Sequence, residues 1–227
     1  MKLFNSFTLN LLEAKECIGN LAVITTILQF LSGVLVCKQY MTNKTTGEAS
    51  VLPFLSCILS SLFWLLYGHV KHDEKIILVN VIGIILMSAY TGVFYVYTLK
   101  KTIVVKQCVA SCVIFICIIS YISGDKDHET FFNHLGILAT IFTLLNIAAP
   151  MSKLLYVIRV KNTECLPFPI ILMTLVVTTL WAIYGALSDD FFLTMVNFTG
   201  AVLALVQLSL FLIYPSIPTL PLLPKHI

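Results

Sequence analysis

Seven stretches of mostly apolar residues, each close to the length that crosses a bilayer, follow one another along the chain at short intervals. A spanning helix needs about 20 such residues. The stretches cover residues 18–37, 49–68, 76–98, 103–122, 132–157, 166–187 and 192–214. Only a helix satisfies every backbone polar group inside lipid without a neighbouring strand. The pattern therefore predicts an all-α membrane protein with seven transmembrane helices.

Composition supports this reading and excludes other classes. The chain is 59% hydrophobic and 11% charged, whereas soluble domains carry about 25% charged residues. A net charge of +3 without a basic stripe gives no reason to expect nucleic acid. The seven cysteines form neither a CxxC pair nor a Cys/His cluster, so we interpret them as small packing residues and expect no metal and no cofactor.

Charged residues between the stretches predict the orientation. One set of loops holds Lys38, Lys44, Lys100, Lys101, Lys106, Lys153, Arg159, Lys161 and Lys225, against Glu48 and Glu164. The other set is mainly acidic, with Asp73, Asp125, Asp127, Asp189 and Asp190. Because basic loops stay in the cytoplasm, we expect the N-terminus outside and the C-terminus inside. We expect the plasma membrane, with the Golgi or another endomembrane as the alternative.

The chain contains an internal repeat. When residues 18–97 are aligned with residues 135–214, about one position in four is identical, several times the share expected from composition. The pattern W-x2-Y-G-x11-N-x2-G occurs in both halves, and its two tryptophans are the only ones in the chain. Each half has three helices, so a single helix between them restores the direction of the chain. The halves are then parallel repeats, related by an axis along the membrane normal.

This 3+1+3 arrangement predicts the domain boundaries. Residues 1–101 form the N-terminal repeat, 102–131 the linker helix and its loop, 132–214 the C-terminal repeat, and 215–227 a short cytoplasmic tail rich in proline. Binding sites in parallel-repeat carriers lie between the repeats, near the middle of the membrane.

The doubled motif and the helix pattern resemble the SWEET family of sugar transporters, and the short loops and tail are similar to its animal members. In that family one asparagine from each half binds sugar hydroxyls, which implies this role for Asn80 and Asn197. An uncharged amide has donors and acceptors for hydroxyls, although buried asparagines also join membrane helices. The resemblance likewise implies that Trp64 and Trp181 flank the sugar, while a position in an interfacial aromatic belt is the alternative.

The same resemblance implies three further groups of residues. The pocket is lined from the first and fifth helices by Thr26, Gln29, Thr143 and Asn146, for which hydrogen bonding between helices is the competing explanation. The hinges on the cytoplasmic side are Gly33, Pro53, Pro150 and Pro167, with glycine in place of the first of four family prolines and Pro169 as a rival to Pro167. The extracellular gate is formed by Tyr67, Tyr184 and Asp190, with Asp73 as the symmetry mate of Asp190.

The absence of an ionisable residue in the middle of any stretch favours transport without proton coupling. We therefore expect a facilitative, bidirectional uniporter for a mono- or disaccharide, which works by alternating access and is not an enzyme. Its expected partners are the sugar and the lipid bilayer. The sequence does not decide whether the chain forms a homo-oligomer. The alternatives are a seven-helix membrane receptor and a membrane adaptor that does not transport.

Overall fold

The computed structural model describes residues 2–124 and 127–217, with side chains for residues 10–124, 127–147 and 153–217. In this part of the chain every regular element is a helix. The helices are α1 (Lys2–Leu31), α2 (Gly33–Asn43), α3 (Leu52–Lys71), α4 (Glu74–Tyr97), α5 (Lys101–Ile122), α6 (His128–Val160), α7 (Phe168–Leu187) and α8 (Phe191–Ile213). Their length and composition give seven candidate membrane spans, because α1 and α2 together form one. The predicted all-α fold is confirmed.

The first helix is longer than predicted. It was expected over residues 18–37, but α1 begins at Lys2 and α2 ends at Asn43, with a break between them at Ser32. The apolar stretch underestimates the helix because it stops at the charged residues Glu16 and Lys38. Charges end the part that lies in lipid, but they do not end a helix. The other boundaries differ from the prediction by at most a few residues.

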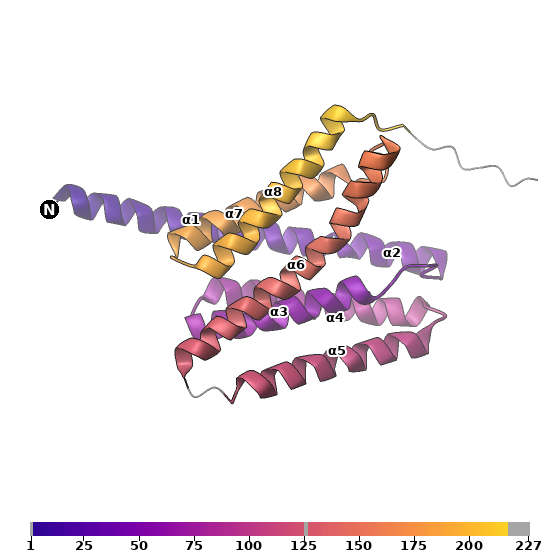
Figure 1. Ribbon diagram of the computed structural model, residues 1–227, viewed down its shortest axis with the longest axis horizontal. Coiled ribbons are helices and arrows are strands. Elements are labelled where there is room, and N and C mark those ends of the chain that lie inside the picture. Colours follow the sequence, from indigo (N-terminus) through magenta and orange to yellow (C-terminus); the bar gives the residue numbers. More distant parts are fainter. Residues whose placement is uncertain (1, 125–126, 218–227) are drawn as a thin grey trace, which may run out of the picture.

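The helices form two groups, one for each repeat. The N-terminal repeat consists of α1, α2, α3 and α4, and the C-terminal repeat consists of α6, α7 and α8, with α5 beside α3 (Figure 1). The repeats meet where α1 packs on α7 and α3 packs on α6. Only 6% of the span in α5 is buried inside the protein, so most of this linking helix faces away from the other helices, although its Phe115 and Ile122 pack against the core between the repeats.

The two repeats share backbone details as well as sequence. Lys44 and Lys161 end their helices with positive φ angles of 56° and 55°. His72 and Asp189 occupy equivalent turns with φ angles of 57° and 49°. The residue after each of these two turns is an aspartate that caps the next helix, α4 or α8. An aspartate here satisfies amide groups that the first turn of a helix leaves unpaired.

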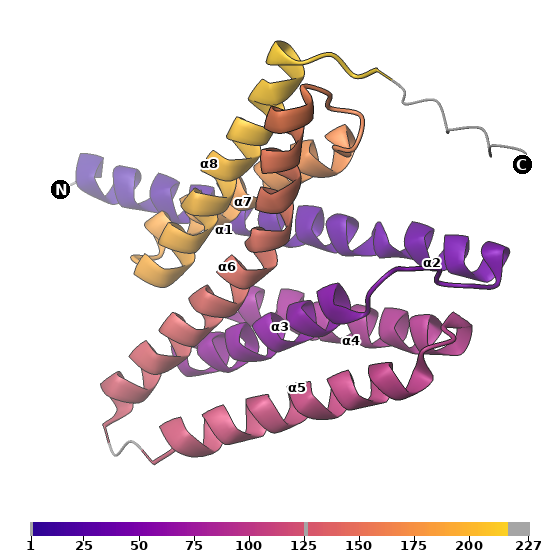
Figure 2. The same cartoon turned by 45° about the vertical axis from the view of Figure 1, so that its right-hand side comes forward.

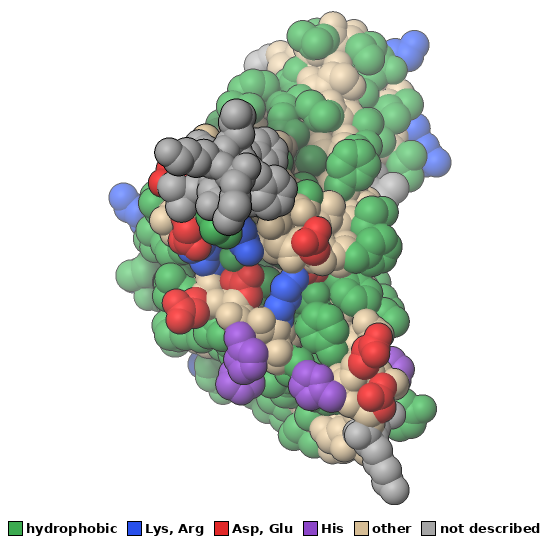
Figure 3. All heavy atoms as spheres, turned by 90° about the vertical axis from the view of Figure 1, so that its left-hand side faces the viewer, with side chains coloured by type: hydrophobic (Ala, Val, Ile, Leu, Met, Phe, Trp, Pro, Cys, Tyr) green, Lys and Arg blue, Asp and Glu red, His purple; other side chains and the backbone are tan. Residues whose placement is uncertain are grey.

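The two ends of the helices differ in charge and in shape. We call the end with Asp73, Asp127 and Asp190 the acidic end, and Figure 3 shows acidic side chains spread over it. The end with Lys44 and Lys161 is the basic end. The repeats converge toward the acidic end, whereas α6 and α8 slant away from α2 and α4 toward the basic end (Figures 1 and 2). The hydrophobic core between the repeats includes Phe63 and Leu135, both fully buried.

Candidate functional site

A cavity of about 220 Å³ lies between the two repeats, and we call it the central cavity. Both motif asparagines and both tryptophans line it, together with Thr26, Thr143 and Asn146. Seven of the eight predicted binding residues therefore meet in one space, although they come from α1, α3, α4, α6, α7 and α8. None of the described residues that line the central cavity is charged. This chemistry suits a neutral ligand that carries hydroxyl groups.

The two asparagines are oriented in the same way. The Asn80 side-chain nitrogen donates to the Ile76 carbonyl at 2.8 Å, and the Asn197 nitrogen donates to the Leu193 carbonyl, also at 2.8 Å. Both bonds run one turn back along the same helix, so they do not join helices. An amide has two N–H donors and one carbonyl. Each asparagine therefore keeps one donor and its carbonyl oxygen for a ligand, which matches two neighbouring hydroxyls of a sugar.

The two tryptophans reach across the boundary between the repeats. The Trp64 indole N–H donates to the Thr143 hydroxyl at 2.9 Å, and the Trp181 N–H donates to the Thr26 hydroxyl at 2.8 Å. Their exposed fractions are only 7% and 6%, which does not fit an aromatic belt at the membrane surface. Because each N–H is used by a threonine, the indoles offer a ligand their flat faces. An indole face packs well against the C–H groups of a sugar ring.

A hydroxyl network between α3 and α6 supports one of these tryptophans, Trp64. The Thr143 hydroxyl donates its proton to the Ala139 carbonyl at 2.9 Å. It can then only accept from Trp64 and from the Ser60 hydroxyl, whose oxygen is 2.9 Å away. The equivalent of Ser60 in the other repeat is Val177, so the two sides of the central cavity differ here. Sequence symmetry did not indicate Ser60, because its mate is apolar.

A second cavity of about 520 Å³ adjoins the central cavity on the side of the basic end, and we call it the vestibule. It is lined by α6, α7 and α8 together with Gln29 of α1, and it reaches Lys153 and Pro167. The Gln29 side-chain nitrogen donates to the Thr174 hydroxyl at 2.8 Å, which connects α1 to α7. The Asn146 nitrogen makes a longer contact of 3.5 Å with the Ser56 carbonyl. Gln29 thus lines the vestibule, whereas Asn146 lies between the two cavities.

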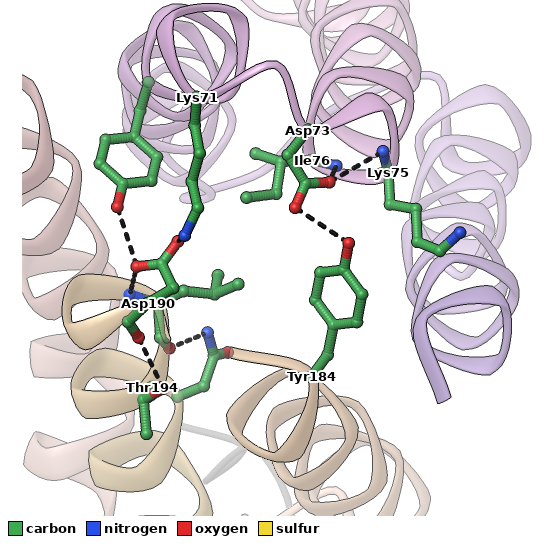
Figure 4. Close-up of polar contacts among 10 residues, drawn as sticks. Lys71, Asp73, Lys75, Ile76, Tyr184, Asp190 and Thr194 are labelled. Carbon is green, nitrogen blue, oxygen red and sulfur yellow. Dashed lines mark hydrogen bonds and ion pairs between the residues drawn. The ribbon is translucent and has the colours of Figure 1, made fainter. Parts of the chain in front are cut away.

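The acidic end is closed by hydrogen bonds between the repeats. The Tyr67 hydroxyl donates to Asp190 at 2.8 Å, and the Tyr184 hydroxyl donates to Asp73 at 2.9 Å (Figure 4 shows the second bond). The predicted gate residues therefore pair across the repeats, and each aspartate also caps a helix. Lys71 adds an ion pair with Asp190, whose side chain is fully buried. Sequence symmetry did not indicate Lys71, because its mate is Ser188.

The predicted hinge residues occupy different kinds of position. Gly33 begins α2 directly after the helix break, and a Cβ atom there would lie 2.4 Å from the Tyr90 ring. The Tyr90 hydroxyl donates to the Phe30 carbonyl at 3.1 Å, just before the break. Pro53 lies in the first turn of α3, and Pro167 is the N-cap of α7. These two fit helix starts, where proline is common.

The remaining predicted hinge proline is Pro150, and Pro169 is the alternative to Pro167. Pro150 lies in α6, but its side chain is outside the described residues. Pro169, the rival to Pro167, lies in the first turn of α7. Of the four hinge positions, Gly33 is the one at which the described chain shows an interrupted helix.

The fold and the site define a class of protein: a multi-pass membrane protein of two parallel three-helix repeats. Between them lies a cavity with apolar walls and several neutral polar groups, and hydrogen bonds between the repeats close one end. A family profile described as "Sugar efflux transporter for intercellular exchange" matches residues 16–102 and again residues 133–219. A structure of a eukaryotic SWEET transporter has a TM-score of 0.81 and 26% identity, and the match covers 88% of this chain and 96% of that one.

Curated relatives agree with this match. The chain is 40% identical to the sugar transporter SWEET1 of Drosophila pseudoobscura pseudoobscura, over 89% of this chain and 90% of the relative. It is 32% identical to SWEET1 of Xenopus tropicalis, over 85% and 91%, and 28% identical to human SWEET1, over 86% and 88%. The chain belongs to the SWEET family of sugar transporters.

Proposed function

We propose that this chain is a facilitative, bidirectional uniporter that carries a mono- or disaccharide by alternating access. The observation that carries the proposal is the pair of amides, Asn80 and Asn197, which face one central cavity from the two repeats with a donor and an acceptor each left for the ligand. The relatives are named as sugar transporters, and transport rather than catalysis is the role we assign to the site.

The charge distribution supports transport without proton coupling. No charged residue is among the described residues that line the central cavity, and the vestibule adds only Lys153, which is exposed. A proton-coupled carrier needs an ionisable group on the substrate path inside the membrane. The buried carboxylate of Asp190 lies at the acidic end and is already paired with Lys71. Sugar therefore moves down its own concentration gradient.

Alternating access is supported by the unequal ends of the site. Bonds between the repeats close the acidic end, while the vestibule extends the central cavity toward the basic end. In the other conformation of the transport cycle the acidic end would be open and the basic end closed. The Tyr–Asp bonds would be broken and the repeats would meet at the basic end. We assign bending to the break at Gly33, to the N-terminal turns that contain Pro53 and Pro167, and to Pro150.

We further propose the plasma membrane as the site of action, with the acidic end and the N-terminus outside. The basic end then faces the cytoplasm, as expected from its lysines. In this orientation the conformation is open to the inside. We keep the predicted units: residues 1–101 and 132–214 move as the two repeats, residues 102–131 link them, and residues 215–227 form a cytoplasmic tail.

The test is D-glucose exchange by the Asn80→Ala and Asn197→Ala variants in proteoliposomes. A sugar hydroxyl that loses its partner in a desolvated site costs about 1–3 kcal/mol, or roughly fivefold to a hundredfold in affinity. Both variants should lose nearly all exchange while keeping the wild-type unfolding temperature, because the bonds that they lose join no helices. Asn133→Ala, at an exposed position of α6, should exchange normally. Normal exchange by both cavity variants would remove these residues from the site.

A further inference from the structure

The vestibule is present in one repeat and filled by side chains in the other. In the N-terminal repeat the corresponding space contains an aromatic cluster, in which the Phe54 ring centroid lies 6.0 Å from that of Tyr90 and 6.5 Å from that of Phe94. Tyr90, Phe94 and Met87 are all buried. In the C-terminal repeat the residues equivalent to Phe54, Met87 and Tyr90 are smaller: Ile171, Ala204 and Gln207. All three of these line the vestibule, so the replacements account for the space.

The vestibule and the central cavity adjoin each other. Thr143, Asn146, Val196 and Asn197 line both of them. A second ring joined to a ring that touches Asn197 in the central cavity would therefore lie next to the vestibule, toward the basic end. The central cavity, at about 220 Å³, is below the range of about 300–1,000 Å³ that is typical of pockets for larger ligands. It suits one ring, and the vestibule offers the room for another.

Apart from the exposed Lys153, the vestibule has the same kind of lining as the central cavity. Its wall combines apolar side chains with the neutral polar groups of Gln29, Asn146, Thr174 and Thr178. The Gln29 nitrogen donates to Thr174, and the Thr174 hydroxyl donates to the Ile170 carbonyl at 2.9 Å. The Gln29 amide thus has its carbonyl oxygen and a second N–H left for a ligand. Amides and hydroxyls on an apolar wall again suit a sugar ring.

We propose that the vestibule is a second saccharide-ring subsite, which receives the second ring of a disaccharide whose first ring lies between Trp64 and Trp181. This inference rests on the proposed function, because it takes the central cavity as the site of the first ring. On this proposal only the C-terminal repeat has room for a longer saccharide, since the aromatic cluster occupies the equivalent space in the N-terminal repeat. Ala204 and Ile171 are then positions at which side-chain size sets how long a saccharide can bind.

Equilibrium binding of D-glucose and maltose to the purified full-length chain tests this subsite. Maltose is two glucose rings, so the pair differs only in the second ring. The two tryptophans of the chain both line the central cavity, so their fluorescence reports the first ring directly. The filling variants are Ala204→Met and Ile171→Phe, which restore the residue found at the equivalent place in the N-terminal repeat. The matched controls are Val202→Met and Ile183→Phe, at exposed positions of the same helices.

Both filling variants should weaken maltose binding at least tenfold and change the Kd for glucose less than twofold, while the controls change neither. Each variant is used only if its unfolding temperature equals that of the wild type. If just one filling variant meets this condition, that variant is enough to test the subsite. Equal weakening of both sugars, no change in either, or a wild-type chain that binds glucose but not maltose would each overturn the subsite. A wild-type chain that neither binds nor exchanges glucose would instead contradict the proposed function.

Discussion

Tyr67→Phe tests whether the bonds at the acidic end hold the observed conformation. The substitution removes only the hydroxyl that donates to Asp190 at 2.8 Å. It keeps the ring, whose centroid lies 4.7 Å from that of Phe132 in a stacked arrangement. Asp190 remains the cap of α8, because the Leu193 amide still donates to it at 2.9 Å. The change is therefore specific to the contact between the two repeats.

The expected magnitude follows from the charge and burial of the bond. A hydrogen bond to a charged group contributes about 1.5–3 kcal/mol, and Asp190 is only 3% exposed. In the state that is open at the acidic end, the Tyr67 hydroxyl and the Asp190 carboxylate would both bind water instead. Removing the hydroxyl therefore destabilises the closed state alone. The balance between the two states should shift by about tenfold to a hundredfold toward the open one. Tyr184→Phe should shift it less, because its partner Asp73 is only half-buried.

Cys57 provides the assay, because this native thiol lines the central cavity. A membrane-impermeant thiol reagent, added outside intact cells, reaches Cys57 only when the acidic end is open and faces outward. Mass spectrometry of the labelled peptide should show a rate about tenfold or more above wild type for Tyr67→Phe, and a smaller rise for Tyr184→Phe. Tyr121→Phe, which removes a hydroxyl from a side chain that is 83% exposed, is the control. An unchanged or slower rate in Tyr67→Phe would refute this role of the bond.

Two further predictions concern orientation and the helix break. An epitope at residue 1 should be stained on intact cells and one at residue 227 only after permeabilisation, since the basic end should face the cytoplasm; surface staining of residue 227 would reverse the orientation. Gly33→Ala should lower the unfolding free energy by about 1–3 kcal/mol through overpacking against Tyr90, which thermal unfolding in detergent measures. Gly92→Ala on α4, where an added Cβ meets nothing within 4 Å, should be neutral or stabilising, and equal effects of the two changes would argue against close packing at Gly33.

Most of the fold could be predicted because a membrane simplifies the reading of a sequence. Apolar stretches of spanning length predicted all seven spans, and the doubled motif predicted which helices correspond. The error at the first helix arose because hydropathy measures the part of a helix that lies in lipid. Residues 2–17 and 38–43 are helical beyond that part, and only the coordinates reveal them.

Which residues line the central cavity was also largely predictable from the sequence, but the hydrogen bonds among them were not. Symmetry indicated Trp64 and Trp181 as a pair, yet it could not show that each indole donates to a threonine of the opposite repeat. Symmetry failed to indicate Lys71 and Ser60, because the residues at the equivalent positions, Ser188 and Val177, have different chemistry. A search for positions where the repeats differ in charge would have found Lys71. The vestibule needed packing information, because a smaller side chain leaves space only if its neighbours do not close in.

Counterflow of D-glucose in proteoliposomes that contain only the purified chain tests uncoupled sugar transport most directly. Vesicles are preloaded with unlabelled glucose and diluted into a trace of labelled glucose, with no ion gradient and with the same pH on both sides. A uniporter should accumulate the label transiently above its outside concentration, and an imposed pH gradient should not change the initial rate. No accumulation, or accumulation only when a pH gradient is imposed, would contradict the assignment of this chain as a facilitative sugar uniporter.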